Sequence, residues 1–262
     1  PSDPEYNHYF SPRFNAVKSF TNKIIGYVDK DFSSMDAYFG SSEYVDMIHA
    51  LQLECTSADI SFAAPLSYDF SFKAGYMNFQ SLMNLYPFEN LLYTINLTGR
   101  EVKDYLEYSY KKWVNKVSSP DTPMLVIEYN DNSKARLKNM HFNFDSAAGI
   151  LYEVDITKGD GERVKILSMA DGKPFDLNKM YRVAMSSYRA SGGGDLLTAG
   201  AGIPFEELDS RVVLRLKDIR GLIYEKIKRD GKLSPRKLNT WKFVPEQLVL
   251  EKVSIEKDEL FR

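Results

Sequence analysis

The stretch at residues 181–197 constrains the fold more than any other part of the chain. It reads Tyr-Arg-Val-Ala-Met-Ser-Ser-Tyr-Arg-Ala-Ser-Gly-Gly-Gly-Asp-Leu-Leu. Its first half alternates apolar and polar side chains, which predicts a strand, and it then breaks into three consecutive glycines. A glycine triplet gives up side-chain packing, so a fold keeps it where the backbone turns tightly or approaches another group closely. The sequence therefore predicts a strand that ends at a sharp corner.

The residues around this corner are compatible with a binding site as well as with a turn. Tyr188 and Arg189 stand just before the glycines, and Asp195 stands just after them. Together they would form a small pocket with a flat wall, exposed amides and one anion, which suits a planar, hydrogen-bonding ligand such as a nucleobase. A glycine-rich corner with a surface tyrosine accounts for the same residues equally well. The stretch by itself leaves both interpretations open.

Local patterns predict helices and further strands along the chain. The strongest is Thr98-Gly-Arg-Glu101, a capping box that opens a helix whose apolar side chains continue to Val117. Asn78 and Asp218 are candidate N-caps of two other helices. Helices are expected at residues 14–25, 42–53, 78–86, 98–117 and 218–229, and strands at residues 59–63, 91–97, 124–129, 151–157, 163–169 and 181–187.

The order of these elements predicts the fold class. Helices and strands alternate only in part, and Asp160-Gly161 and Asp171-Gly172 supply hairpin-type turns between the later strands. This pattern favours an α+β fold with mixed β-sheets flanked by helices over a doubly wound parallel sheet.

Both ends of the chain are predicted to lie outside the main domain. Pro1, Pro4 and Pro12 favour an extended start, and apolar residues from Phe14 onward then recur at helical spacing until Gly26. We therefore expect a linker helix or a plain packing helix within residues 1–30, a main domain at residues 31–245, and a C-terminal tail at residues 246–262 with a short extended run near 248–255. Because the first residue is proline rather than methionine, we expect a processed protein or an excised piece of a longer one.

Composition and motifs narrow the functional classes. The formal net charge of −2, with no long basic block, argues against a nucleic-acid partner. The single cysteine, Cys55, excludes an internal disulfide framework, and no apolar run reaches membrane-spanning length. His8, His49 and His141 lie outside any metal-binding spacing and are expected to be structural. With neither a P-loop nor a nucleophile-elbow sequence, the chain shows no catalytic machinery of its own.

Three segments occur in a characteristic order and at suitable separations. They are Ala58-Asp-Ile-Ser-Phe62, then Asn84-Leu-Tyr-Pro-Phe-Glu-Asn90 followed by Leu97-Thr-Gly-Arg-Glu101, and finally Ser187-Tyr-Arg-Ala-Ser-Gly-Gly-Gly-Asp195. The ordered set resembles the C-terminal domain of the 5'-nucleotidase family, which includes UDP-sugar hydrolases and 2',3'-cyclic-nucleotide 2'-phosphodiesterases. The resemblance covers about residues 20–230 and implies the layered α/β/β/α fold of that domain.

The resemblance implies a division of labour between two domains. An N-terminal metallophosphoesterase domain in cis binds two divalent metal ions and hydrolyses the phosphate ester, whereas the C-terminal domain binds the nucleoside or nucleotide. On this basis the rings of Phe88 and Tyr188 would sandwich the base, and Asn90 and Asp195 would help to hold the base or the ribose. No cofactor is expected in this chain itself. The candidate substrate-binding residues are Phe88, Asn90, Tyr188, Arg189, Gly192, Gly193, Gly194 and Asp195.

One loop departs from the nucleotidase pattern. Nucleotidases carry an Asn-Gly-Gly-x-Arg loop whose arginine meets the substrate phosphate, but this chain has Phe62-Ala-Ala-Pro-Leu66 at that place. The Ala-Pro pattern is more similar to the cyclic-phosphodiesterase branch. Arg189 and Lys73 are the candidates to replace the missing arginine.

The resemblance thus implies a nucleoside-binding domain of an exported bacterial 5'-nucleotidase or cyclic-nucleotide phosphodiesterase. Such a protein would lie in the periplasm or at the cell surface, and this chain would be inactive without the metal domain. The alternative is a stand-alone domain that binds a nucleotide or a sugar and has no hydrolytic partner. An independent enzyme is a third possibility, and it would require turnover by this chain alone.

Overall fold

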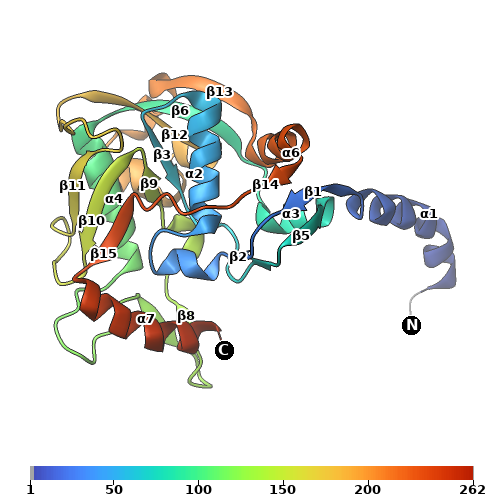
Figure 1. The fold of residues 1–262 in the computed structure, drawn as a ribbon, viewed down its shortest axis with the longest axis horizontal. Helices are drawn as coiled ribbons and strands as arrows, with labels where there is room; N and C mark the ends of the chain where they lie inside the picture. Colours follow the sequence, from blue (N-terminus) through green and yellow to red (C-terminus); the bar gives the residue numbers. More distant parts are fainter. Residues whose placement is uncertain (1–2, 262) are drawn as a thin grey trace.

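The structure is a computed structural model that describes residues 3–261. Its centre is a five-stranded mixed sheet with the strand order β13-β6-β12-β3-β9 (Figure 1). Val183 of β12 pairs with Ile95 of the antiparallel strand β6 and with Ile60 of the parallel strand β3. The five strands are β3 (Ile60–Ala63), β6 (Leu91–Thr98), β9 (Ser146–Ala148), β12 (Met180–Ser186) and β13 (Val212–Asp218).

This topology brings four separate segments to one edge of the sheet. β12 and β3 run parallel, so both of them end at this edge, while β6 and β9 run antiparallel to them and begin there. The residues that follow β3 and β12 therefore lie beside the residues that precede β6 and β9. The strand that ends at residue 186 does lead into the glycine corner, as predicted, through the short helix α5 (Ser187–Ala190).

The two faces of the central sheet pack into different hydrophobic cores. Val183 and Met185 of β12 belong to the core that includes residues of α4, whereas Ala184 between them belongs to the core that includes residues of α2. This is the period-2 alternation expected of a strand that is covered on both sides. The covering helices are α2 (Glu43–Thr56), α4 (Gly99–Trp113) and α6 (Ile219–Asp230).

The three predicted helix caps are confirmed, whereas the first helix starts at Pro4 rather than near Phe14. The Thr98 hydroxyl accepts a hydrogen bond from the backbone N–H of Glu101 at 3.2 Å, and the Glu101 carboxylate accepts one from the N–H of Thr98 at 2.7 Å, which completes the capping box. Asn78 caps α3 (Phe79–Leu85), and Asp218 caps α6. α4 is shorter than predicted because the chain becomes extended at Val114.

A second mixed sheet, β11-β10-β15, carries the C-terminal helix α7 (Glu246–Phe261) beside it (Figure 1). The prediction of an extended run near residues 248–255 is wrong. Val249 and Leu260 are buried at helical spacing, but Lys252 and Glu256 are buried on the same face. Because two of the buried positions carry charged residues, the sequence does not show the apolar periodicity of a helix. The Glu256 carboxylate accepts hydrogen bonds from the backbone N–H groups of residues 124 and 125 at 2.5 and 2.8 Å. The strands of this sheet are β10 (Ile150–Asp155), β11 (Val164–Met169) and β15 (Trp241–Val244).

The N-terminal helix α1 (Pro4–Thr21) projects from the body of the molecule (Figure 1). The predicted extended start is wrong for Pro4 and Pro12, since Pro4 opens the helix after the cap residue Asp3 and Pro12 lies inside it; Pro1 lies outside the described residues. Gly26 does not end this helix but lies in β1 (Ile24–Val28), where an added side chain would collide with Ile227 of α6. β1 is the middle strand of the small sheet that also contains β5 (Gly75–Asn78) and β14 (Lys232–Leu233).

One hairpin is placed as predicted and another is not. β10 and β11 pair antiparallel on either side of Asp160-Gly161, but the turn at Asp171-Gly172 leads from β11 into the different sheet that contains β12. Of the strand expected at residues 124–129, only Ile127–Tyr129 form a strand, β7. The α+β class with mixed sheets flanked by helices is confirmed. The remaining elements are β2 (Phe32–Ser33), β4 (Ser71–Phe72), β7 (Ile127–Tyr129), β8 (Ala135–Leu137) and the short helical turns η1 (Met35–Tyr38), η2 (His141–Asn143), η3 (Gly193–Asp195), η4 (Leu196–Gly200), η5 (Phe205–Glu207) and η6 (Asp209–Arg211).

No helix within residues 3–261 combines the length and the apolar character that crossing a membrane requires.

Candidate functional site

A pocket of about 270 Å³ lies at the sheet edge where β3 and β12 end and where β6 and β9 begin. Four chain segments meet there because of the strand directions, and each contributes part of the wall. The wall is mainly apolar, with a few polar groups from Gln52, Asn90, Asp145, Ser186 and Arg189, which is the usual composition of a small-molecule site. The lining residues are Ile48, Gln52, Phe62, Ala63, Ala64, Leu66, Tyr86, Phe88, Asn90, Phe142, Asp145, Ser186, Tyr188 and Arg189.

The structure brings four of the predicted binding residues together in this pocket: Phe88, Asn90, Tyr188 and Arg189. Phe88 and Tyr188 are separated by a hundred positions in the chain, yet both rings line the same cavity. The rings are 39% and 44% exposed, respectively, so neither is a core aromatic. Asn90 adds a side-chain amide to the same wall. The backbone carbonyl of Asn90 accepts a hydrogen bond from the backbone N–H of Ile219 at 2.9 Å.

The glycine corner does not line the pocket itself, although its residues were predicted as binding residues. Gly192, Gly193, Gly194 and Asp195 lie outside the set of lining residues, and the Asp195 side chain is exposed. A Cβ added at Gly193 would lie 2.5 Å from the Tyr188 ring, and one at Gly194 would lie 2.5 Å from the Arg189 guanidinium. The glycines therefore make room for the two side chains that do reach the pocket.

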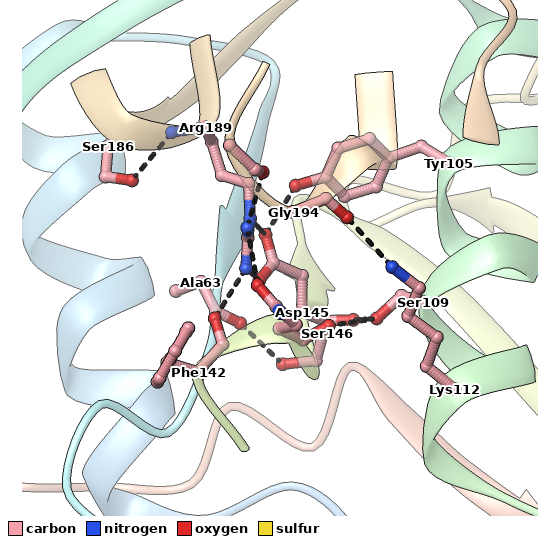
Figure 2. A network of polar contacts seen from close by, with 12 residues as sticks. Ala63, Tyr105, Ser109, Lys112, Phe142, Asp145, Ser146, Ser186, Arg189 and Gly194 are labelled. Carbon is pink, nitrogen blue, oxygen red and sulfur yellow. Dashed lines mark hydrogen bonds and ion pairs between the residues drawn. The ribbon is translucent and has the colours of Figure 1, made fainter. Parts of the chain in front are cut away.

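Arg189 is the centre of a buried polar network in the pocket wall (Figure 2). Its Nε donates to Asp145 Oδ2 at 3.0 Å and its Nη2 donates to Asp145 Oδ1 at 2.7 Å, which is a bidentate pair. The Tyr105 hydroxyl donates to the same Asp145 carboxylate at 2.5 Å. Arg189 is 3% exposed and Asp145 is 1% exposed. Burial by itself would lower the pKa of Arg189, but the Asp145 charge outweighs burial and raises that pKa.

Neither candidate for the missing phosphate-binding arginine is free in the pocket. The charge of Arg189 is compensated by Asp145. Lys73 lies outside the lining residues, and its ammonium group forms an exposed ion pair with Asp31 at 2.8 Å. The loop that follows β3 contributes Ala63, Ala64 and Leu66 to the pocket, and these side chains carry no charge. The described wall thus offers apolar surface and neutral hydrogen-bonding groups, but no uncompensated cation.

A buried histidine supports the wall from behind. His49 Nδ1 lies 2.9 Å from the hydroxyl of Ser61 on β3, and His49 Nε2 lies 3.1 Å from the hydroxyl of Ser146 on β9. Burial lowers the pKa of His49 to about 3, so the ring is neutral at physiological pH. Its neutral contacts with two serine hydroxyls agree with the structural role predicted for it.

Phe142 and Asp145 are among the lining residues that sequence reasoning missed. Phe142 lies in the turn η2 and Asp145 follows it directly before β9. The stretch His141-Phe-Asn-Phe-Asp145 alternates polar and apolar side chains, which is the pattern of an ordinary strand, so nothing in the local pattern marks these side chains as part of a site. Only the pairing of β9 with β3 brings them to the pocket.

The family resemblance also implies two divalent metal ions, bound by the N-terminal domain. Within residues 3–261, no group of three or more His, Cys, Asp or Glu side chains is arranged to hold a metal ion. The described residues therefore do not fit the two divalent metal ions of the hydrolytic reaction, and no step through a metal can be assigned to them.

Comparison with known proteins agrees with this architecture. The family model for the 5'-nucleotidase C-terminal domain matches residues 21–200. A 2',3'-cyclic-nucleotide 2'-phosphodiesterase/3'-nucleotidase of Salmonella typhimurium is 30% identical over 184 residues, which are 65% of this chain and 26% of that protein. A Haemophilus influenzae protein of the same name is 25% identical over 278 residues, covering 93% of this chain and 40% of the relative.

A solved structure of a 5'-nucleotidase precursor from Thermus thermophilus has the same fold, with a TM-score of 0.67. It is 17% identical and covers 94% of this chain and 44% of that chain. The present chain thus spans less than half the length of these similar proteins. Because the family model covers more than half of the described residues, the predicted resemblance is confirmed, and the chain belongs to the 5'-nucleotidase family, whose C-terminal domain it contains.

Proposed function

We propose that this chain is the nucleoside- or nucleotide-binding C-terminal domain of an exported bacterial 5'-nucleotidase or cyclic-nucleotide phosphodiesterase. The observation that supports this proposal is the convergence of Phe88, Asn90 and Tyr188 on one pocket at the sheet edge. Two half-exposed rings from distant segments are hard to explain by packing alone, because an aromatic side chain contributes most to stability when it is buried.

The chemistry of the wall suits the base and sugar better than the phosphate. Every nucleobase has a flat π-face, so stacking on Phe88 and Tyr188 would give affinity with tolerance for different bases. The Asn90 amide at the same wall would then discriminate between hydrogen-bonding patterns at the edge of the ligand. The lack of an uncompensated cation among the lining residues favours the cyclic-phosphodiesterase branch over the branch whose loop arginine meets the phosphate.

Hydrolysis would take place outside this pocket. In the proposed arrangement, a metallophosphoesterase domain N-terminal to this chain supplies two divalent metal ions, and this domain presents the nucleoside to them. The curated relatives are named as phosphodiesterases and nucleotidases and are much longer than this chain, which supports a partner domain in cis. Export to the periplasm or the cell surface is part of the same proposal.

The test is the binding of adenosine to the chain, measured by calorimetry for the parent and for Phe88→Ala and Tyr188→Ala. Removing one stacking face should cost roughly 1–3 kcal/mol, or about five- to a hundredfold in affinity. Unfolding stability should change by less than about 1 kcal/mol, because neither ring is buried.

Phe14→Ala is the matched control, since Phe14 is an exposed ring on α1 outside the pocket and its loss should leave affinity unchanged. If both pocket variants bind adenosine as the parent does, or if either of them unfolds the domain, the two rings are structural and the proposed function is wrong.

A further inference from the structure

A third aromatic ring, that of Phe142, lies in the pocket beside Phe88 and Tyr188. Its centroid is 5.9 Å from the centroid of the Phe88 ring, and the two planes meet at 68°, which is an edge-to-face contact. Phe88 itself lies in the irregular connection between α3 and β6, so no helix or strand fixes its ring. The contact with Phe142 therefore restrains the orientation of Phe88.

The segment that carries Phe142 is in turn attached to Arg189. The guanidinium Nη2 donates to the carbonyl of Phe142 at 2.5 Å, and Nη1 donates to Asn143 Oδ1 at 3.0 Å. Nη1 also donates to the carbonyl of Gly193 at 2.7 Å, which ties the same side chain to the glycine corner. With the two bonds to Asp145, the interactions match the five N–H donors that a guanidinium possesses.

Arg189 also contacts the opposite ring of the pocket. Its guanidinium carbon lies 5.2 Å from the centroid of the adjacent Tyr188 ring, within the range of a cation–π interaction. One buried side chain is thus connected to Tyr188 directly and to Phe88 through Phe142. The network in Figure 2 shows Arg189, on the short helix α5 after β12, reaching the segment of Phe142 and Asp145.

We infer that Arg189 is a positioning residue for the nucleoside pocket and that Phe142 is the ring through which it acts. This inference rests on the proposed function, because it assumes that Phe88 and Tyr188 bind the ligand. Arg189 has no N–H left for a substrate phosphate, so its place in the wall is explained by the spacing that it imposes on the rings. Phe142 supports the Phe88 face without being one of the two stacking rings.

The test measures adenosine affinity by calorimetry for Phe142→Ala, Arg189→Lys and the double variant. Phe142→Ala should weaken binding roughly two- to tenfold, the scale of one aromatic contact. Lysine retains the charge beside Asp145 but cannot donate to four separate groups in a plane, so Arg189→Lys should weaken binding by a similar factor. If Arg189 acts through Phe142, the double variant should bind no more than about twofold more weakly than Arg189→Lys alone.

A role in stability alone would give a different result, because the folded Arg189→Lys variant would then bind adenosine as the parent does. Arg211→Lys is the matched control: Arg211 forms ion pairs with Glu101 and Glu207 away from the pocket, and its replacement should leave affinity unchanged. If Arg189→Lys does not fold, Asn143→Ala takes its place in the cycle, since it removes one bond from the same network.

The outcomes separate this inference from the proposed function. Weak binding by Tyr188→Ala with parental binding by Phe142→Ala and Arg189→Lys would overturn the inference and leave the proposed function standing. Additive losses in the double variant would also overturn it. If the parent chain binds no adenosine, the proposed function fails and the inference fails with it.

Discussion

The two sides of the pocket carry comparable rings but are held in different ways. On the Tyr188 side, Arg189 and Asp145 form a buried ion pair that is nearly inaccessible to water. On the Phe88 side, the chain is fixed mainly by backbone groups: the N–H of Leu91 donates to the hydroxyl of Ser187 at 3.0 Å. We call these the clamped side, comprising Phe142, Asp145, Tyr188 and Arg189, and the loop side, comprising residues 86–91.

The difference shows where binding and stability are coupled. A buried charge that loses its partner is strongly destabilising, so substitutions of Arg189 or Asp145 on the clamped side should affect folding and the pocket together. The loop side has an exposed ion pair between Glu89 and Arg220 at 3.1 Å, in which the Glu89 side chain is 85% exposed. A substitution that breaks this ion pair should leave folding almost unchanged, because solvent screens such a pair.

The largest effect is expected for Asp145→Ala on the clamped side. The substitution leaves the Arg189 charge buried and removes the acceptor of the Tyr105 hydroxyl, so it should lower the free energy of unfolding by about 3–5 kcal/mol. Urea unfolding at neutral pH measures the change. Asp31→Ala is the control, because Asp31 forms an exposed pair with Lys73, and it should cost much less. Equal losses in the two variants would show that the clamped side is not special.

A second effect concerns His49, which supports the clamped side through Ser146. Its pKa is about 3 in the folded protein and about 6.5 when unfolded, so the unfolded chain binds more protons between these values. The contribution of His49 to the free energy of unfolding is fully present above pH 6.5 and is lost as the pH falls below that value. Between pH 7 and pH 5 the free energy of unfolding should fall by about 2 kcal/mol on this account. Urea unfolding of the parent and of His49→Gln at both pH values measures it.

The glutamine variant lacks this titration but keeps every carboxylate, so its loss of stability over the same pH interval should be smaller than that of the parent. The same loss in both proteins would mean that His49 is not the group that titrates.

The smallest effect is expected for Glu89→Gln on the loop side. The change removes an exposed ion pair and should lower stability by less than about 1 kcal/mol. Adenosine affinity should remain within about twofold of the parent, because Glu89 is not among the residues that line the pocket. A loss comparable to that of Asp145→Ala would remove the proposed difference between the two sides.

The comparison also separates what local patterns predict from what they miss. The capping residues Asn78, Thr98 and Asp218 were predicted because each contacts backbone groups within three residues of itself. The helix α7 was missed because its buried charges are satisfied by distant groups. Lys252 donates to the carbonyl of Pro120, and Glu256 accepts from the backbone at residues 124 and 125. Neither partner is visible in the pattern of residues 246–262.

Local sequence patterns predict the family, the strand that leads to the glycine corner, and Phe88 and Tyr188 as candidate binding residues, because each depends on residues in a short ordered motif. The folded chain was needed to show that Asp145 compensates the charge of Arg189 and that Phe142 lines the pocket. The physical reason is that the state of a charge depends on what surrounds it. Its neighbours here come from a segment more than forty residues away, which β-sheet pairing brings to the same edge.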